Sequence, residues 1–96
     1  MLIIKYKGLT AKQTCEACPE QYDVFNEEGN QVAYFRLRWG HFRVDTPDCG
    51  GETIYECDTK GNGCFEDSNE RKNTIIKAFE AVFQNDYIEI ENDDNY

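Results

Sequence analysis

The spacing of the apolar residues changes once along the chain, and this change restricts the fold more than any other feature. Before residue 58, apolar and polar residues alternate in short runs, most clearly over residues 31–39. An alternation with a period of two is typical of a β-strand that buries one face. One face of this strand carries Ala33, Phe35, Leu37 and Trp39, and the other carries Val32, Tyr34, Arg36 and Arg38.

Shorter runs of the same kind predict further strands. We expect these strands over residues 2–7, 21–27, 41–46 and 52–57. Residues 8–17 are expected to form a loop that holds the first pair of cysteines. Gly29 and Gly40 lie between strand candidates, and glycine adopts the backbone conformations that tight turns need. Residues 21–46 therefore predict a three-stranded meander.

From residue 67 onward the apolar spacing is that of a helix. Asp67 and Glu70 are three positions apart, as in a capping box at a helix start. One apolar stripe then follows at helical spacing, made of Ile75, Ile76, Phe79, Val82 and Phe83. We expect a helix of about sixteen residues that ends at residues 85–86, a last short strand over residues 87–91, and a flexible acidic tail over residues 92–96.

Strands followed by a helix predict a single α+β domain over residues 1–91. The expected architecture is an antiparallel meander of about four to five strands, with one C-terminal helix packed on one face.

The charge of the chain excludes one large class of function. Nineteen Asp and Glu residues against ten Lys and Arg residues give a net charge of −9. A protein that neutralises nucleic-acid phosphates needs a basic face, so we expect no direct binding of DNA or RNA. Binding to anionic membranes also needs clusters of Lys and Arg, and we expect none.

The acidic residues are concentrated in one region. Eight of them, with Lys60 as the only basic residue, are Asp45, Asp48, Glu52, Glu56, Asp58, Glu66, Asp67 and Glu70. We interpret them as a partner-binding surface that imitates nucleic-acid phosphates and docks into the basic groove of another protein. The alternative is that they only keep the protein soluble.

A small basic and aromatic patch interrupts the acidic surface. Tyr34, Arg36 and Arg38 share one strand face, and Arg43 is expected on the neighbouring strand. Tyrosine and arginine are common anchors of protein interfaces, so this patch is a second candidate for partner binding or for a homodimer. The alternative is that the arginines pair with acidic residues across strands.

Five cysteines raise the question of a metal site. Their odd number, with no secretory leader, favours a reducing cytoplasmic setting. Cys15 and Cys18 have the two-residue spacing of a zinc-binding pair. The candidate zinc ligands are Cys15, Cys18, Cys49 and Cys57, with Cys64 as the alternative to Cys57. The competing interpretation is that these residues are free thiols, buried or loosely placed.

We expect no enzyme. His41 is the only histidine and Ser68 the only serine, and the pattern predicts a turn for the first and a helix cap for the second. The glycines do not have the spacing of a phosphate-binding loop.

Three segments carry a resemblance to known proteins. They are residues 18–25, Cys-Pro-Glu-Gln-Tyr-Asp-Val-Phe, residues 34–45, Tyr-Phe-Arg-Leu-Arg-Trp-Gly-His-Phe-Arg-Val-Asp, and residues 47–52, Pro-Asp-Cys-Gly-Gly-Glu. Together they resemble small acidic proteins of phages and bacterial mobile elements. The short, acidic, single-domain profile is also similar to that of anti-defence proteins such as anti-CRISPRs. This resemblance implies an inhibitor that blocks a nucleic-acid-handling defence complex in the cytoplasm of a bacterial host. The alternative function is a small zinc-stabilised structural or adaptor module.

Overall fold

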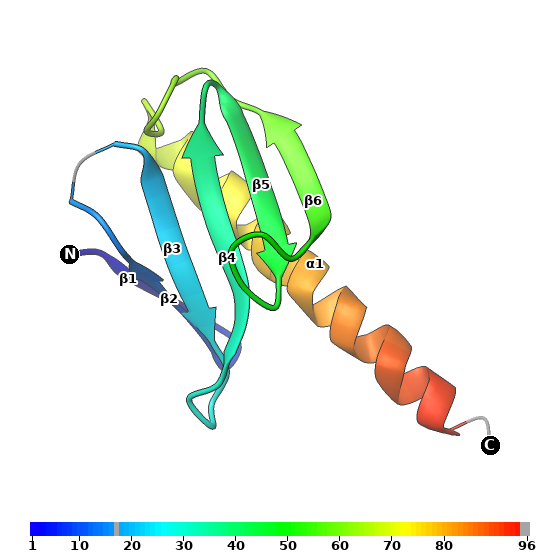
Figure 1. The fold of residues 1–96 in the computed structure, drawn as a ribbon. Helices are drawn as coiled ribbons and strands as arrows, with labels where there is room; N and C mark the ends of the chain where they lie inside the picture. The colour runs from blue at the N-terminus through cyan, green and yellow to red at the C-terminus, as the bar shows by residue number, and fades with distance from the viewer. Residues whose placement is uncertain (17, 95–96) are drawn as a thin grey trace.

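Six strands pair with one another in chain order, and one long helix lies across one face of the resulting sheet (Figure 1). This computed structural model describes the backbone of residues 1–16 and 18–94 and the side chains of residues 1–16 and 18–85. The elements are β1 (Ile3–Tyr6), β2 (Leu9–Gln13), β3 (Glu20–Phe25), β4 (Gln31–Arg38), β5 (His41–Thr46), β6 (Glu52–Asp58) and α1 (Ser68–Asp94). All neighbouring strands are antiparallel, so the predicted α+β architecture is confirmed, with one strand more than expected.

The additional strand is β2, and the predicted loop over residues 8–17 is wrong. Leu9 and Ala11 are buried on the helix side of the sheet, while Thr10 and Lys12 alternate with them. Lys7 and Gly8 both have positive φ angles, 48° and 89°, which suit a two-residue hairpin between β1 and β2. The small side chain of Ala11 makes the alternation of β2 faint in the sequence.

Helix α1 begins where the sequence predicts. The Asp67 carboxylate accepts hydrogen bonds from the backbone N–H groups of Asn69, at 2.7 Å, and Glu70, at 3.2 Å. Asp67 is therefore the N-cap. The reciprocal half of the predicted capping box does not form, because the Glu70 carboxylate accepts from the backbone N–H of Lys60 at 3.1 Å instead.

The predicted end of the helix at residues 85–86 and the predicted strand over residues 87–91 are wrong. Helix α1 continues to Asp94 and runs past the edge of the sheet (Figure 1). Neither glycine nor proline occurs after Gly63, so no residue interrupts the helix once it has started. Of the predicted tail, residues 92–94 belong to α1, and residues 95–96 lie outside the described residues. Within the described part of the chain, no helix has the length and apolar character needed to cross a membrane.

The core lies between α1 and the strands. Phe79 of α1 packs between Phe35 of β4 and Tyr6 of β1, with ring centroids 5.4 Å from each. The buried residues of the sheet are mainly Tyr22, Val24, Phe35, Leu37, Phe42 and Val44. Trp39, predicted on this face, is 75% exposed, because its φ of 58° turns it away at the β4–β5 hairpin.

Candidate partner-binding surface

The face of the sheet opposite α1, here called the outer face, carries polar side chains. The strand register places Gln21, Arg36, Arg43 and Glu56 in one row across β3 to β6. The next row is Arg38, His41 and Asp58. Among the described residues, no helix or strand covers the outer face (Figure 1). It is therefore available to a partner.

A basic patch, made of Arg36, Arg38 and Trp39, lies at one end of the outer face. The Arg38 guanidinium lies 5.6 Å from the centroid of the Trp39 ring, within range of a cation–π interaction. Arg36 and Arg38 make no ion pair with any described side chain. A hollow of about 510 Å³ beside them is also lined by Asn62 and Gly63. This patch can hold an anionic group.

Two residues predicted to contact a partner are buried, and that prediction is wrong for both. Tyr34 is 6% exposed, and its hydroxyl donates to the Gln21 side chain at 2.5 Å. Burial and the neighbouring Cys49 thiol raise the pKa of Tyr34. The Asp45 carboxylate, 2% exposed, accepts from Thr53 Oγ1 at 2.8 Å and lies 3.2 Å from Arg43 Nε. The β5–β6 loop covers this end of the face, and the accessible residues of the predicted patch are Arg36, Arg38 and the partly exposed Arg43.

The other predicted acidic residues divide into three groups. Asp67 and Glu70 serve the start of α1, as described above. Glu52, Glu56 and Asp58 are exposed on β6, the last strand of the sheet, and are here called the acidic edge. Glu56 and Asp58 lie on the outer face, where they pair with Arg43 and His41, whereas a bulge in β6 places Glu52, the partner of Thr46, on the other face. The remaining two, Asp48 and Glu66, are exposed in the loops before and after β6.

His41 links the outer face to the acidic edge. Its Nε2 lies 2.7 Å from Glu56, and its Nδ1 lies 3.3 Å from Asp58. These two hydrogen-bonding carboxylates raise the pKa of His41. Part of the acidic edge is therefore neutralised when His41 is protonated.

We expect the NMR titration of His41 to have its midpoint above the ordinary value of about 6.5. Because the pKa is raised in the folded protein, the resulting stabilisation is present below the unfolded pKa and is lost as the pH rises through the folded pKa. Glu56→Gln should lower the midpoint, and Glu52→Gln should leave it unchanged. A midpoint at or below 6.5 in the unchanged protein would contradict this arrangement.

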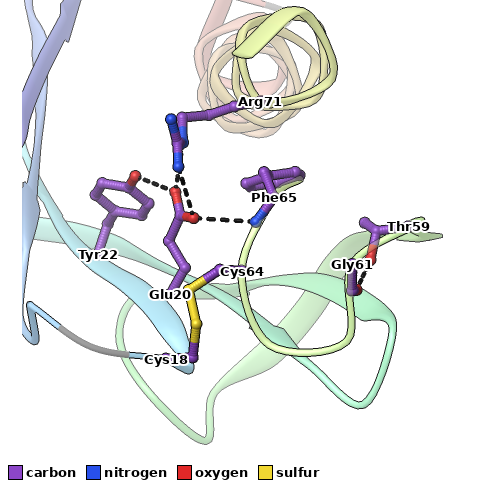
Figure 2. Close-up of a disulfide and its surroundings, with 8 residues drawn as sticks. All are labelled: Cys18, Glu20, Tyr22, Thr59, Gly61, Cys64, Phe65 and Arg71. Carbon is purple, nitrogen blue, oxygen red and sulfur yellow. Dashed lines mark hydrogen bonds and ion pairs between the residues drawn. A yellow bond between two sulfur atoms is a disulfide. The ribbon is translucent and has the colours of Figure 1, made fainter. Parts of the chain in front are cut away.

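A buried ion pair joins the sheet to α1, and no pattern in the sequence predicted it. The carboxylate of Glu20, at the start of β3, accepts two bonds from Arg71, at 2.8 and 3.1 Å (Figure 2). It also accepts from the Tyr22 hydroxyl at 2.5 Å and from the backbone N–H of Phe65 at 3.2 Å. Burial alone would raise the pKa of Glu20, but these hydrogen bonds outweigh burial and hold the pKa below its usual value.

The structure does not assemble the predicted zinc site. Cys18 is bonded to Cys64 in a disulfide, with the two Cα atoms 5.5 Å apart (Figure 2). Cys18 is therefore not a free thiolate, and Cys64 cannot substitute for Cys57. Cys15, Cys49 and Cys57 are not in disulfides. Among the side chains of residues 1–16 and 18–85, no three His, Cys, Asp or Glu residues are grouped so that they could hold a metal ion.

Comparison of the chain with protein-family models, curated proteins and solved structures gives no match. Its function therefore has to be inferred from the chemistry of its own residues.

Proposed function

We propose that this chain is a non-enzymatic binding protein that docks its acidic edge onto the basic, nucleic-acid-binding surface of a protein partner. The observation that carries the proposal is the placement of Glu52, Glu56 and Asp58. All three are exposed on one strand, and the pairing of β6 with β5 fixes Glu56 and Asp58 side by side on the outer face. A rigid row of carboxylates can compete with nucleic-acid phosphates for a groove lined with Lys and Arg.

The net charge of −9 supports the same proposal. A strongly acidic protein is steered toward a basic surface, which makes association fast and dependent on ionic strength. The partner class follows from the resemblance to anti-defence proteins: a nucleic-acid-handling defence complex in a bacterial cytoplasm. The alternative zinc-stabilised module gains no support from a structure in which Cys18 is bonded to Cys64.

A cytoplasmic location is part of this proposal, and it can be tested separately. Disulfides are rare in the cytosol because thiols are kept reduced there. Thiol labelling of protein from rapidly acidified cells would report the state of Cys18 and Cys64. Reduced thiols would support the cytoplasmic location, and a fully formed disulfide would contradict it.

We expect stoichiometric amounts of the chain to abolish target-DNA binding by at least one complex in a panel of RNA-guided nucleases, measured by mobility shift. The affinity of the chain for that complex should fall by about tenfold or more between 50 and 200 mM salt, because a few charge pairs between the two proteins are screened. The double variant Glu56→Lys/Asp58→Lys should lose the inhibition.

The matched control for that experiment is Glu27→Lys/Glu28→Lys. These two exposed residues lie in the β3–β4 hairpin, and the control changes the net charge by the same amount. It should retain inhibition at low salt. Equal loss in both variants would show that only net charge matters and would overturn the role of the acidic edge.

A further inference from the structure

The first strand of the sheet has one edge that pairs with no described strand. The strand order is β1 to β6, so β1 is hydrogen-bonded only to β2. An open strand edge presents backbone N–H and C=O groups to which another extended chain can add. This edge lies at the opposite side of the sheet from the acidic edge, and its role goes beyond the proposed function.

The register identifies which backbone groups point outward. Leu2 lies opposite Gln13, and its carbonyl accepts from the Gln13 N–H at 2.9 Å. Residues of an antiparallel pair alternate between bonded and non-bonded positions, so Ile4 and Tyr6 also bond toward β2. The N–H and C=O groups of Ile3 and Lys5 therefore point away from the sheet, free to pair with a seventh strand.

An apolar groove adjoins this edge on the helix side. It has a volume of about 400 Å³, and its apolar lining comes from β1 and α1. The main apolar residues are Leu2, Ile4, Ile75, Ile76 and Phe79. A strand added beside β1 would direct every second side chain toward this groove. Those side chains must be apolar to replace the water in it.

The charges at the β1 edge indicate which side chains the added strand should carry on the outer face. Lys5 lies on the outer face, where its register partner is Thr10, and Lys12 lies opposite Ile3 on the same face. Neither lysine makes an ion pair with a described side chain. The alternate side chains of an added strand would lie beside Lys5, and opposite charges across strands are favourable. Lys12 is one strand further in, with its Nζ 5.2 Å from the ring centroid of Phe25 on β3.

We propose that the β1 edge binds an extended segment of a protein partner in which apolar and acidic residues alternate. The segment adds as a seventh strand, with its apolar side chains in the groove and its carboxylates beside Lys5. A second copy of this chain is a poorer occupant. Its own β1 would bring another Lys5 to the same edge, and lysines on edge strands oppose such pairing.

The test uses a synthetic peptide of about eight residues, a common strand length, in which valine and glutamate alternate. Two further peptides replace every glutamate by lysine or by threonine. We expect the glutamate peptide to bind at least tenfold more tightly than the lysine peptide in fluorescence polarisation. Bound peptide should slow the hydrogen exchange of the Ile3 and Lys5 amides and leave those of Ile4 and Tyr6 nearly unchanged.

Three variants separate the contributions. Lys5→Pro removes the outward N–H and leaves the bonds to β2, so it should abolish binding of every peptide. Lys5→Glu keeps the N–H, so it should weaken binding of the glutamate peptide about tenfold and leave binding of the threonine peptide unaffected. The control Lys77→Glu makes the same charge change on an exposed residue of α1 that does not line the groove. Lys77→Glu should bind each peptide with the affinity of the unchanged protein.

Several results would overturn the proposal. They are equal affinity for the glutamate and lysine peptides, binding without protection of the Ile3 and Lys5 amides, and no binding at millimolar peptide. Sedimentation that shows a dimer lost in Lys5→Pro would assign the edge to a second copy instead. None of these outcomes bears on the acidic edge, because the nuclease experiment uses residues on β6.

Discussion

Replacing Arg71 with methionine should reduce the free energy of unfolding by about 3–5 kcal/mol, because it leaves the buried carboxylate of Glu20 without its cation. Glu20 is 2% exposed, and Arg71 contributes two of its four hydrogen bonds. In a domain of this size, each kcal/mol lowers the melting temperature by about 4–8 °C. Urea denaturation followed by circular dichroism measures the change directly.

Replacing Glu20 instead of Arg71 is expected to cause a smaller loss in the free energy of unfolding. Glu20→Gln leaves Arg71 unpaired, but the Arg71 side chain is 33% exposed and can be solvated. We expect a loss of about 1–3 kcal/mol. The double variant Glu20→Leu/Arg71→Met removes both charges and should be more stable than Arg71→Met alone. A double variant as unstable as the sum of the two single losses would show that the ion pair is not the source of the effect.

The pH dependence gives an independent check. In the unchanged protein the pKa of Glu20 is lowered, so its stabilisation is present above the unfolded pKa and is lost as the pH falls through the folded pKa. In Arg71→Met the unpaired, buried carboxyl should have a raised pKa. The destabilisation caused by Arg71→Met should therefore be smaller at pH 4 than at pH 7.

Removing the disulfide should have an effect of similar size. Cys18 and Cys64 are separated by 46 positions, and cross-linking a loop of this length restricts the unfolded chain by about 4 kcal/mol. We expect Cys18→Ser/Cys64→Ser to lose about 2–4 kcal/mol, measured by thermal and urea unfolding. The unchanged protein should lose the same amount after reduction with dithiothreitol.

The remaining thiols provide the control. Cys15→Ser/Cys49→Ser changes two cysteines that are not in disulfides, so its melting temperature should differ little from that of the unchanged protein. It should also keep its sensitivity to dithiothreitol. A melting temperature of the unchanged protein that does not respond to the reductant would contradict the stabilising role of the disulfide.

The ion pair and the disulfide hold the same region. Cys18 precedes β3 by two residues, Glu20 begins it, and Cys64 and Phe65 lie in the segment that leads into α1 (Figure 2). Both interactions therefore fix the start of the helix against the sheet. Because they are close neighbours, their losses should not add simply, and a combined variant would measure the coupling.

Local patterns predicted the main elements because each pattern reports on its own neighbourhood. The alternation over β4 required a strand, and the stripe from Ile75 to Phe83 required a helix on one face of the sheet. Asp67 was recognisable as an N-cap from the spacing of its neighbours. Where the local signal was weak, the prediction failed: β2 was missed, and the end of α1 was placed too early.

The candidate surface was predictable only in part. Glu56, Asp58 and the two arginines Arg36 and Arg38 follow from residue type and strand alternation. The bulge that moves Glu52 to the other face does not. The burial of Tyr34 and Asp45 does not, because it depends on the path of the β5–β6 loop. An amino-acid pattern shows which face a strand residue points to, but it does not show which loop covers that face.

The sequence by itself determined a sheet with a helix on one side and a carboxylate-rich surface, because hydrophobic periodicity and charge are properties of neighbouring residues. Only the tertiary structure decided that Cys18 bonds to Cys64, that Glu20 meets Arg71 across 51 positions, and that Ile3 and Lys5 leave an open edge. These pairings depend on strand register and on the placement of α1, which no local spacing encodes.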